Sequence, residues 1–103
     1  MAEGINAILE ERGKRYGEFR HHAEITQRLK SILIEGASLS TEAQARVRTR
    51  VASMQPDQVE CLDMLAHKLG RILNGDPNYE DSWRDIAGYA TLVADRLLKP
   101  TRS

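Results

Sequence analysis

Apolar residues recur at steps of three and four positions through the second half of the chain, which is the spacing of one face of an α-helix. Two such runs cover residues 56–74 and 79–98. Pro56 suits the first position of a helix, where a missing N–H needs no partner. Between the runs, Gly75 is expected to cap the first helix in the left-handed conformation, and Pro77 stops its continuation. A joint this short predicts that the two helices pack antiparallel.

The core of this helical hairpin is expected where the two apolar faces meet. Trp83 stands within the repeat of the second helix, so we expect it to be a core residue, with stacking on a base as its alternative role. The first helix contributes Val59, Leu62, Ala66, Leu69 and Leu73. The second contributes Trp83, Ile86, Ala87, Ala90, Val93, Ala94 and Leu97.

Shorter helices are predicted in the first half of the chain. Residues 4–12 have the spacing of a short amphipathic helix, and the segment ERGKRYGEF then predicts a break at Gly13 and a tight turn to Gly17. Residues 18–35 form the next helix, which Gly36 ends.

A third helix is predicted over residues 42–54, with Ser40 as its N-cap. This helix is weakly amphipathic, so we expect it to need a partner surface. Arg46, Arg48 and Arg50 are spaced by two positions and therefore point in different directions around the helix. This spacing argues against a dedicated nucleic-acid face.

No run of residues alternates between apolar and polar over the length of a strand. The fold class is therefore all-α, a four- to five-helix bundle centred on the long antiparallel hairpin. With 103 residues, one domain spanning residues 1–103 is expected. A core of this size supplies only marginal stability, so a homodimer is physically sensible.

Composition limits the classes of function. The 15 basic and 15 acidic residues cancel, so no overall charge attracts nucleic acid or a membrane surface. No apolar run is long enough to cross a membrane. The single cysteine, Cys61, excludes an intramolecular disulfide and favours a reducing cytoplasm. Cys61 falls among helical core positions, where a lone cysteine is usually a small hydrophobic residue.

Acidic residues concentrate in the hairpin, because all six Asp of the chain follow position 50. Glu60 and Asp63 lie one helical turn apart on the first helix, and Asp81 and Asp85 are four apart on the second. Two acid pairs on facing helices offer the hard oxygen ligands that Mg²⁺ or Mn²⁺ prefers. The alternatives are an N-terminal cap for Asp81 and an intrahelical pair with His67 for Asp63.

Cationic and aromatic residues lie near these acids. Lys68 and Arg71 are one turn apart on the first helix and could hold phosphates, or could be solvated with their stems on apolar neighbours. In ERGKRYGEF, Lys14, Arg15 or Tyr16 could contact a phosphate or a base. The alternative is a tight connection in which Tyr16 packs as an anchor. A base could also stack on Tyr89.

Two adjacent histidines, His21 and His22, point about 100° apart on a regular helix. They therefore cannot both hold one metal ion from that helix. Glu24, an acid in the interior of this predicted helix, could add a ligand, but a solvated surface residue is the simpler interpretation.

The segments ERGKRYGEF, LDMLAHKLGRILNGDP and EDSWRDIAGYATL together resemble a family of small phage- and prophage-encoded helical proteins of uncharacterised function. That family is distantly similar to the MazG-like all-α nucleoside triphosphate pyrophosphohydrolases. The resemblance runs from Ile5 to Leu97, except for residues 36–55. It departs from the enzymes in using mostly Asp where they use Glu, and in spacing the second acid pair by four rather than three.

The resemblance implies an oligomeric helical bundle that hydrolyses nucleoside triphosphates to monophosphate and pyrophosphate. The pairs Glu60/Asp63 and Asp81/Asp85 would hold Mg²⁺ against the phosphates, and Lys68 and Arg71 would neutralise charge on the triphosphate. The leading hypothesis is a cytoplasmic nucleotide-binding protein with pyrophosphohydrolase activity.

The alternative hypothesis is a non-catalytic phage-encoded protein that binds or inhibits another protein, such as a host defence system. A nucleic-acid accessory protein that uses the three arginines of residues 42–54 is a weaker third reading. The acid pairs favour the enzyme if they converge, and the protein-binding reading needs an exposed apolar patch instead.

Overall fold

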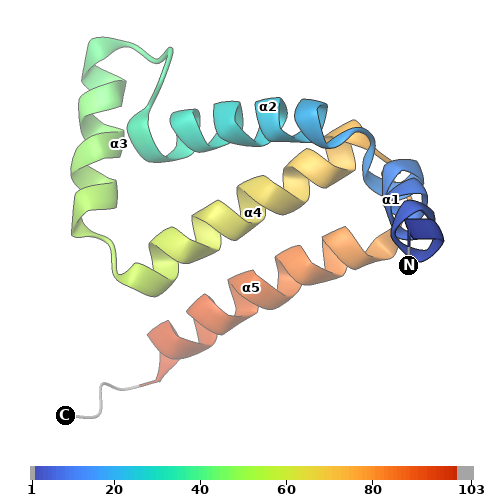
Figure 1. The fold of residues 1–103 in the computed structure, drawn as a ribbon. Coiled ribbons are helices and arrows are strands. Elements are labelled where there is room, and N and C mark those ends of the chain that lie inside the picture. Colours follow the sequence, from blue (N-terminus) through green and yellow to red (C-terminus); the bar gives the residue numbers. More distant parts are fainter. Residues whose placement is uncertain (1, 100–103) are drawn as a thin grey trace.

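The structure, a computed structural model, describes residues 2–99, with side chains from residue 4 onward (Figure 1). Helices make up nearly all of this range, and it contains no β-strand, which confirms the all-α prediction. A short π-helical segment, η1, continues the second helix. The elements are α1 (Ala2–Tyr16), α2 (Phe19–Lys30), η1 (Ser31–Glu35), α3 (Thr41–Ser53), α4 (Pro56–Asn74) and α5 (Glu80–Leu98).

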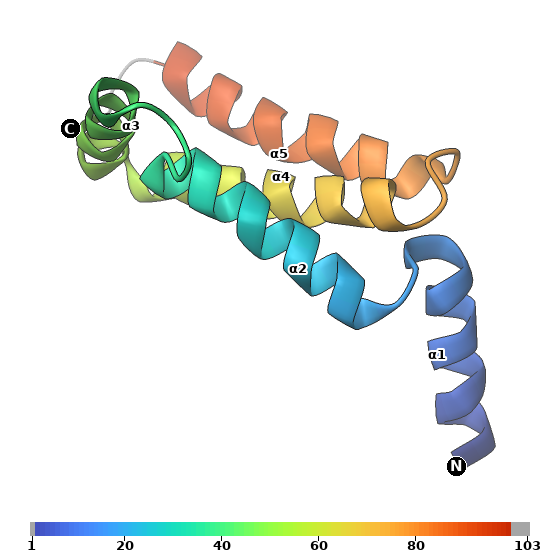
Figure 2. The same cartoon turned by 90° about the horizontal axis from the view of Figure 1, so that it is seen from above.

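Helix α4 is the centre of the arrangement. It lies between α2 and α5 in both views, and α5 runs antiparallel to it, as the short connection predicted (Figures 1 and 2). Helix α3 crosses one end of this row and joins α2 to α4. Helix α1 projects from the other end and contacts the nearest parts of α2 and α4 and the α4–α5 turn (Figure 2).

Because α4 packs against a helix on each side, it has two buried sides rather than the single apolar face predicted from the sequence. On the α2 side, Gly70 leaves room for Thr26, whose Oγ1 would lie 2.2 Å from a Cβ at position 70. On the α5 side, Lys68 is buried, only 8% exposed, and its Nζ contacts Oδ2 of Asp85 on α5. The prediction that Leu73 lies in the core is wrong, since this side chain is 65% exposed.

Trp83 is also not a core residue, because it is 51% exposed. Its indole Nε1 donates a hydrogen bond of 2.8 Å to the Pro77 carbonyl oxygen, which holds the ring against the α4–α5 turn. Among the described elements, helix α5 packs mainly on α4, so it buries chiefly one of its sides. Of its other predicted core positions, Ala87, Ala90, Ala94 and Leu97 are exposed as well, whereas Ile86 and Val93 are half-buried.

Helix α1 is longer than its predicted span of residues 4–12. It continues through Gly13 and ends at Tyr16, where Gly17 turns the chain with φ +77°. The Gly17 N–H donates to the Gly13 carbonyl oxygen at 2.8 Å, so the last turn is complete. A glycine inside a helix costs only about 1 kcal/mol, which is too little to break it without a competing contact.

The connection between α1 and α2 is tied to the end of α4. The Asn74 side chain donates from Nδ2 to the Tyr16 carbonyl oxygen at 2.8 Å and to the Glu18 carbonyl oxygen at 2.9 Å. Gly75 follows, but with φ −133° it is not the left-handed cap that the sequence predicted. A Cβ there would lie 2.0 Å from the Arg15 carbonyl oxygen, so glycine is needed for close backbone contact.

The other predicted helix boundaries are confirmed. Gly36 ends η1 in the left-handed conformation with φ 70°. The Ser40 hydroxyl oxygen accepts from the Ala43 N–H at 3.2 Å, as an N-cap should. Pro56 is the first residue of α4.

The contact at Gly70 can be tested with a matched glycine. Gly70→Ala would push a methyl group into Thr26 and His22, so we expect the free energy of unfolding to fall by about 2 kcal/mol or more. Gly88→Ala meets no atom within 4 Å and should stabilise by about 0.5–1 kcal/mol through helix propensity. Urea denaturation of both variants measures the difference, and equal effects would contradict the packing described above.

Candidate functional site

A cavity of about 450 Å³ lies where α1, α2 and α4 meet. We call it the Tyr16 pocket. Aromatic rings, two arginines and glycine backbone form most of its wall, with one acid, Glu18, among them. Its lining residues are Leu9, Arg12, Gly13, Tyr16, Gly17, Glu18, Phe19, His22, His67 and Arg71.

Two guanidinium groups lie over the ring of Tyr16. The Arg71 Cζ is 4.3 Å from the ring centroid, and the Arg12 Cζ is 5.7 Å from it. Among the described residues, no carboxylate forms an ion pair with either arginine. Both are therefore free to bind an anion, while the tyrosine face fixes their position.

A histidine pair, His22 buried and His67 half-buried, forms another part of the pocket wall. His22 is only 5% exposed, and its Nε2 lies 3.3 Å from Nδ1 of His67, with the rings nearly perpendicular. Thr26 Oγ1 is 3.4 Å from the same Nε2. The Nδ1 of His22 lies beside the Gly70 backbone without a completed hydrogen bond. The pair thus presents uncharged hydrogen-bonding groups inside an otherwise aromatic and cationic wall.

Both histidines are held neutral. The pKa of His67 is lowered to about 4, first by burial and then by the nearby charges of Arg71, His22, Lys68 and Lys30. Burial also lowers the pKa of His22; the Gly70 backbone opposes this shift, and Arg71 adds to it. At neutral pH the positive charge at the pocket therefore comes from the arginines alone.

Of the residues predicted to contact a ligand, Tyr16 and Arg71 line this pocket and the others do not. Arg15 instead pairs with Glu11 at 2.6 Å and lies over the ring of Tyr79, 4.1 Å from its centroid. Lys14 is exposed on α1, and Tyr89 is half-buried on α5. The structure therefore brings together two members of the predicted set from segments 55 positions apart in the sequence.

The four carboxylates predicted to hold a metal do not converge in one chain. The Asp63 Oδ1 lies 3.9 Å from Lys30 Nζ, and the Asp81 Oδ2 accepts from the Tyr79 hydroxyl at 2.8 Å. Glu60 is exposed on α4. Within residues 2–99, no three His, Cys, Asp or Glu side chains form a group that could hold a metal ion. A Mg²⁺ or Mn²⁺ site remains a prediction, because these four carboxylates do not come together within a single chain.

Lys68 and Asp85 bind each other rather than a phosphate and a metal. Lys68 Nζ lies 2.9 Å from Asp85 Oδ2, with the lysine side chain 10% exposed and the aspartate 46% exposed. The ammonium group occupies the place at Asp85 that a cation would take, and the carboxylate cancels the charge that a phosphate would need. The role predicted for Lys68 in neutralising a triphosphate therefore has no geometric support.

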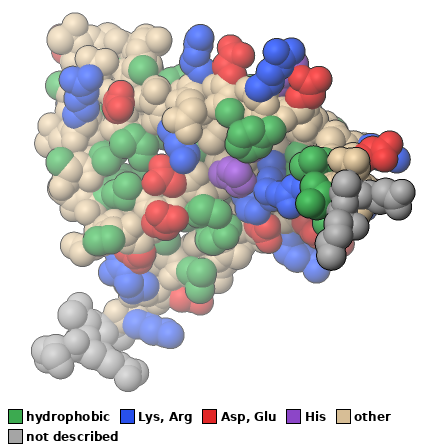
Figure 3. Space-filling view, in the orientation of Figure 1, with side chains coloured by type: hydrophobic (Ala, Val, Ile, Leu, Met, Phe, Trp, Pro, Cys, Tyr) green, Lys and Arg blue, Asp and Glu red, His purple; other side chains and the backbone are tan. Residues whose placement is uncertain are grey.

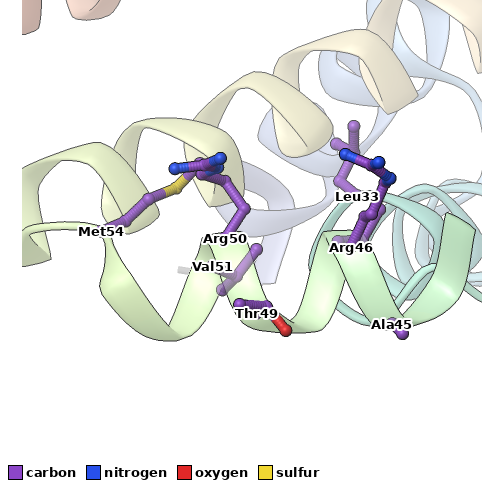
Figure 4. A pocket seen from close by; sticks show the side chains of 8 residues that line it. Leu33, Ala45, Arg46, Thr49, Arg50, Val51 and Met54 are labelled. Atoms are coloured by element: carbon purple, nitrogen blue, oxygen red, sulfur yellow. The ribbon is translucent and has the colours of Figure 1, made fainter.

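The three arginines of α3 do not share one surface. Arg46 and Arg50 extend to the same side of the helix toward a groove of about 550 Å³ that also contains Leu33 and Met54 (Figure 4). Arg48 instead donates from Nε to the Glu35 carbonyl oxygen at 3.2 Å. This arrangement agrees with the expectation that α3 presents no three-arginine face.

Arg12, Phe19 and His67 line the pocket although the sequence did not predict this. Each stands one helical turn or less from a residue that was considered, but only the docking of α1 onto Asn74 shows that the three meet. In Figure 3, a histidine lies beside a group of Lys and Arg side chains near the middle of the visible face. No helix of residues 2–99 combines the length and the apolar character that crossing a membrane requires.

The lowered histidine pKa values predict acid sensitivity. The histidine pKa values of the unfolded chain are near 6.5. Between about pH 6.5 and 4 the unfolded chain therefore binds protons that the folded protein does not bind. Stability should be full above pH 6.5 and fall by about 1–2 kcal/mol on acidification to pH 5, allowing for solvent screening. His67→Gln should remove most of this dependence, whereas the exposed His21→Gln should keep it; denaturation at pH 5 and 7.5 measures both.

The Lys68–Asp85 pair gives a second prediction. Asp85→Asn leaves a buried ammonium group without its counter-charge, so we expect about 1–2 kcal/mol of destabilisation, moderated by the half-exposed position of Asp85. Glu80→Gln, which breaks the exposed pair with Arg84, should cost less than about 0.5 kcal/mol. If thermal unfolding shows no difference between the two variants, the pair is not the buried contact described above.

Comparison with known proteins places the chain in a family. No curated protein and no solved structure matches it. A family model matches residues 1–97, which include every element from α1 to the last full turn of α5 as well as the whole Tyr16 pocket. The chain belongs to the family described as a domain of unknown function, DUF6378.

Proposed function

We propose that the protein binds a nucleotide in the Tyr16 pocket. The observation that carries this proposal is the position of Arg71 and Arg12 over Tyr16 at a cavity of about 450 Å³, with no carboxylate of the described residues paired to either cation. A phosphate matches guanidinium groups through charge and bidentate hydrogen bonds. A planar base matches the aromatic part of the wall through stacking.

Different parts of the pocket wall suit the base and the phosphate of a nucleotide. Phe19 is among the most exposed apolar side chains of the molecule, and it stands at the same pocket as the two arginines. A base that covers Phe19 removes this apolar surface from water, while the phosphate stays near the cations. Within the neutral histidine pair, His67 Nε2 is the ring nitrogen that can meet a base edge, because His22 Nε2 contacts His67 Nδ1 and His22 Nδ1 is buried beside Gly70.

The resemblance to MazG-like pyrophosphohydrolases is what makes a nucleoside triphosphate the first ligand to test. Hydrolysis is a separate proposal, because one chain does not assemble the carboxylates that would hold Mg²⁺. The proposals of a phage origin and of a cytoplasmic location are based on the same resemblance.

The second candidate function is binding to another protein without catalysis. A specific observation favours it: the buried hydrophobic core of the described chain contains only Ala66 and Ile72, while large apolar side chains on α1 and α5 are exposed. Surfaces of this kind are typical of chains that fold or act against a partner. A protein partner and a nucleotide can coexist, since α5 does not line the Tyr16 pocket.

Nucleotide binding can be tested with a stem-preserving variant. Wild-type protein should show a melting temperature several degrees higher with a saturating nucleoside mono- or triphosphate, because a ligand at 100 times its Kd adds about 2.7 kcal/mol. Arg71→Met removes the guanidinium but keeps an unbranched side chain, and should weaken binding about 10- to 100-fold by calorimetry. Arg84→Met, on α5, is the matched control and should bind like wild type.

The same samples separate the two candidates. Binding that persists in EDTA without pyrophosphate release in Mg²⁺ or Mn²⁺ supports a nucleotide-binding protein that is not an enzyme. Pyrophosphate release that Arg71→Met abolishes supports the hydrolase. Absence of any nucleotide effect on the melting temperature would contradict both and favour the protein-binding function.

A further inference from the structure

Helix α5 carries two apolar sides, and only one of them has a neighbour. Ser82, Ile86, Tyr89 and Val93 are buried or half-buried and lie on the side that faces α4. A second set, Trp83, Ala87, Ala90, Ala94 and Leu97, follows steps of 4, 3, 4 and 3 residues and is exposed throughout. We call this second set the α5 stripe.

The spacing of the α5 stripe is that of a helix–helix seam. Alternating steps of four and three place side chains in one line that a second helix can cover along its length. The stripe covers 14 residue steps, or about 21 Å of helix. Trp83 and Leu97, 51% and 59% exposed, stand at its ends, and alanines occupy the middle, where they allow two backbones to approach closely.

The order of side chains along the stripe is nearly symmetric about Ala90. Ala87 and Ala94 lie three and four positions from it, and Trp83 and Leu97 lie seven positions from it on either side. An antiparallel copy of the same helix therefore sets Trp83 against Leu97, Ala87 against Ala94, and Ala90 against itself. Such pairing is what a two-fold interface requires, since each residue and its contact occur twice.

The accessible surface area of the chain is larger than that of a compact monomer of the same mass. A compact monomer of 11.6 kDa exposes about 5,800 Å², whereas this chain exposes 7846 Å². The radius of gyration is 16.7 Å, against about 13 Å for a compact domain of this length. A stable dimer buries about 800 Å² per partner, so less than half of the surplus surface is enough to form one.

We propose that a second copy of this chain covers the α5 stripe, with the two α5 helices antiparallel and Ala90 at the two-fold axis. Figures 1 and 2 show α5 at the edge of the row formed with α2 and α4, where another helix can approach it. This interface goes beyond the nucleotide proposal and does not depend on it, because no α5 residue lines the Tyr16 pocket.

The first test is the mass of the protein in solution. Light scattering after size exclusion should give twice the chain mass of 11.6 kDa at micromolar concentration. Ala90→Glu places two carboxylates against each other at the axis, and should raise the dissociation constant at least 100-fold while circular dichroism keeps the helical signal. Ala52→Glu, the same change at an exposed position of α3, should leave the dimer intact.

A disulfide test fixes the orientation. With Cys61→Ser in the background, Ala90→Cys should form a covalent dimer under mild oxidation, and Ala52→Cys should not. A mixture of Ala87→Cys and Ala94→Cys should cross-link to each other more than either does to itself, as antiparallel helices require. Three results would overturn the proposal: a monomer in the wild type, a dimer that survives Ala90→Glu, or cross-links that form only between identical positions.

Discussion

The contact of α2 with α4 at Gly70 is the constraint on which the rest of the structure depends. A side chain at this position would overlap Thr26 and His22, so the two helices can approach only because glycine stands there. The approach brings His22 within 3.3 Å of His67, and it buries His22 and half-buries His67. Desolvation then keeps the pair neutral, with the pKa of His67 near 4, in a wall that also contains two arginines.

The cations of α4 have different environments although they stand one turn apart. Lys68 faces α5, where Asp85 neutralises it, and so it contributes to the hairpin rather than to a ligand site. Arg71 faces α1, where it stacks on Tyr16 and meets no carboxylate of the described chain. The direction in which each side chain leaves α4 therefore decides which cation stays available for an anion. The same geometry separates Asp63 from Asp85, which leaves the metal prediction without a site in one chain.

The sequence was sufficient for the helices and insufficient for their contacts. Helical spacing, Pro56 and Ser40 set boundaries that the structure confirms, because caps and periodicity act locally. The predictions for Gly13 and Gly75 rested on their local preference; α1 continues through Gly13 because no competing contact breaks it, and the close approach of Arg15 and Tyr16 decides the conformation of Gly75. Trp83 and Leu73 were assigned to the core from spacing alone, which cannot show how many neighbours a helix has.

For the candidate site, too, the sequence indicated residue types but not the contacts between them. Tyr16 and Arg71 were recognisable as ligand-binding residue types, but their meeting depends on Asn74, whose two hydrogen bonds dock the α1–α2 connection onto α4. Arg12 and His67 gave no signal of their own, because a surface arginine and a helical histidine are common. A pocket built from three helices is a tertiary property, and one sequence does not contain the distances that form it.

The most direct test of the account is the position of a bound nucleotide, mapped by amide chemical shifts in an isotope-labelled sample titrated with a nucleoside monophosphate. The expected shifts concentrate at Tyr16, Gly17, Phe19, His67 and Arg71 and saturate with one affinity, while the amides of residues 90–97 stay unchanged. Shifts confined to the acidic residues of α4 and α5, or no shifts at millimolar ligand, would contradict a nucleotide site at Tyr16.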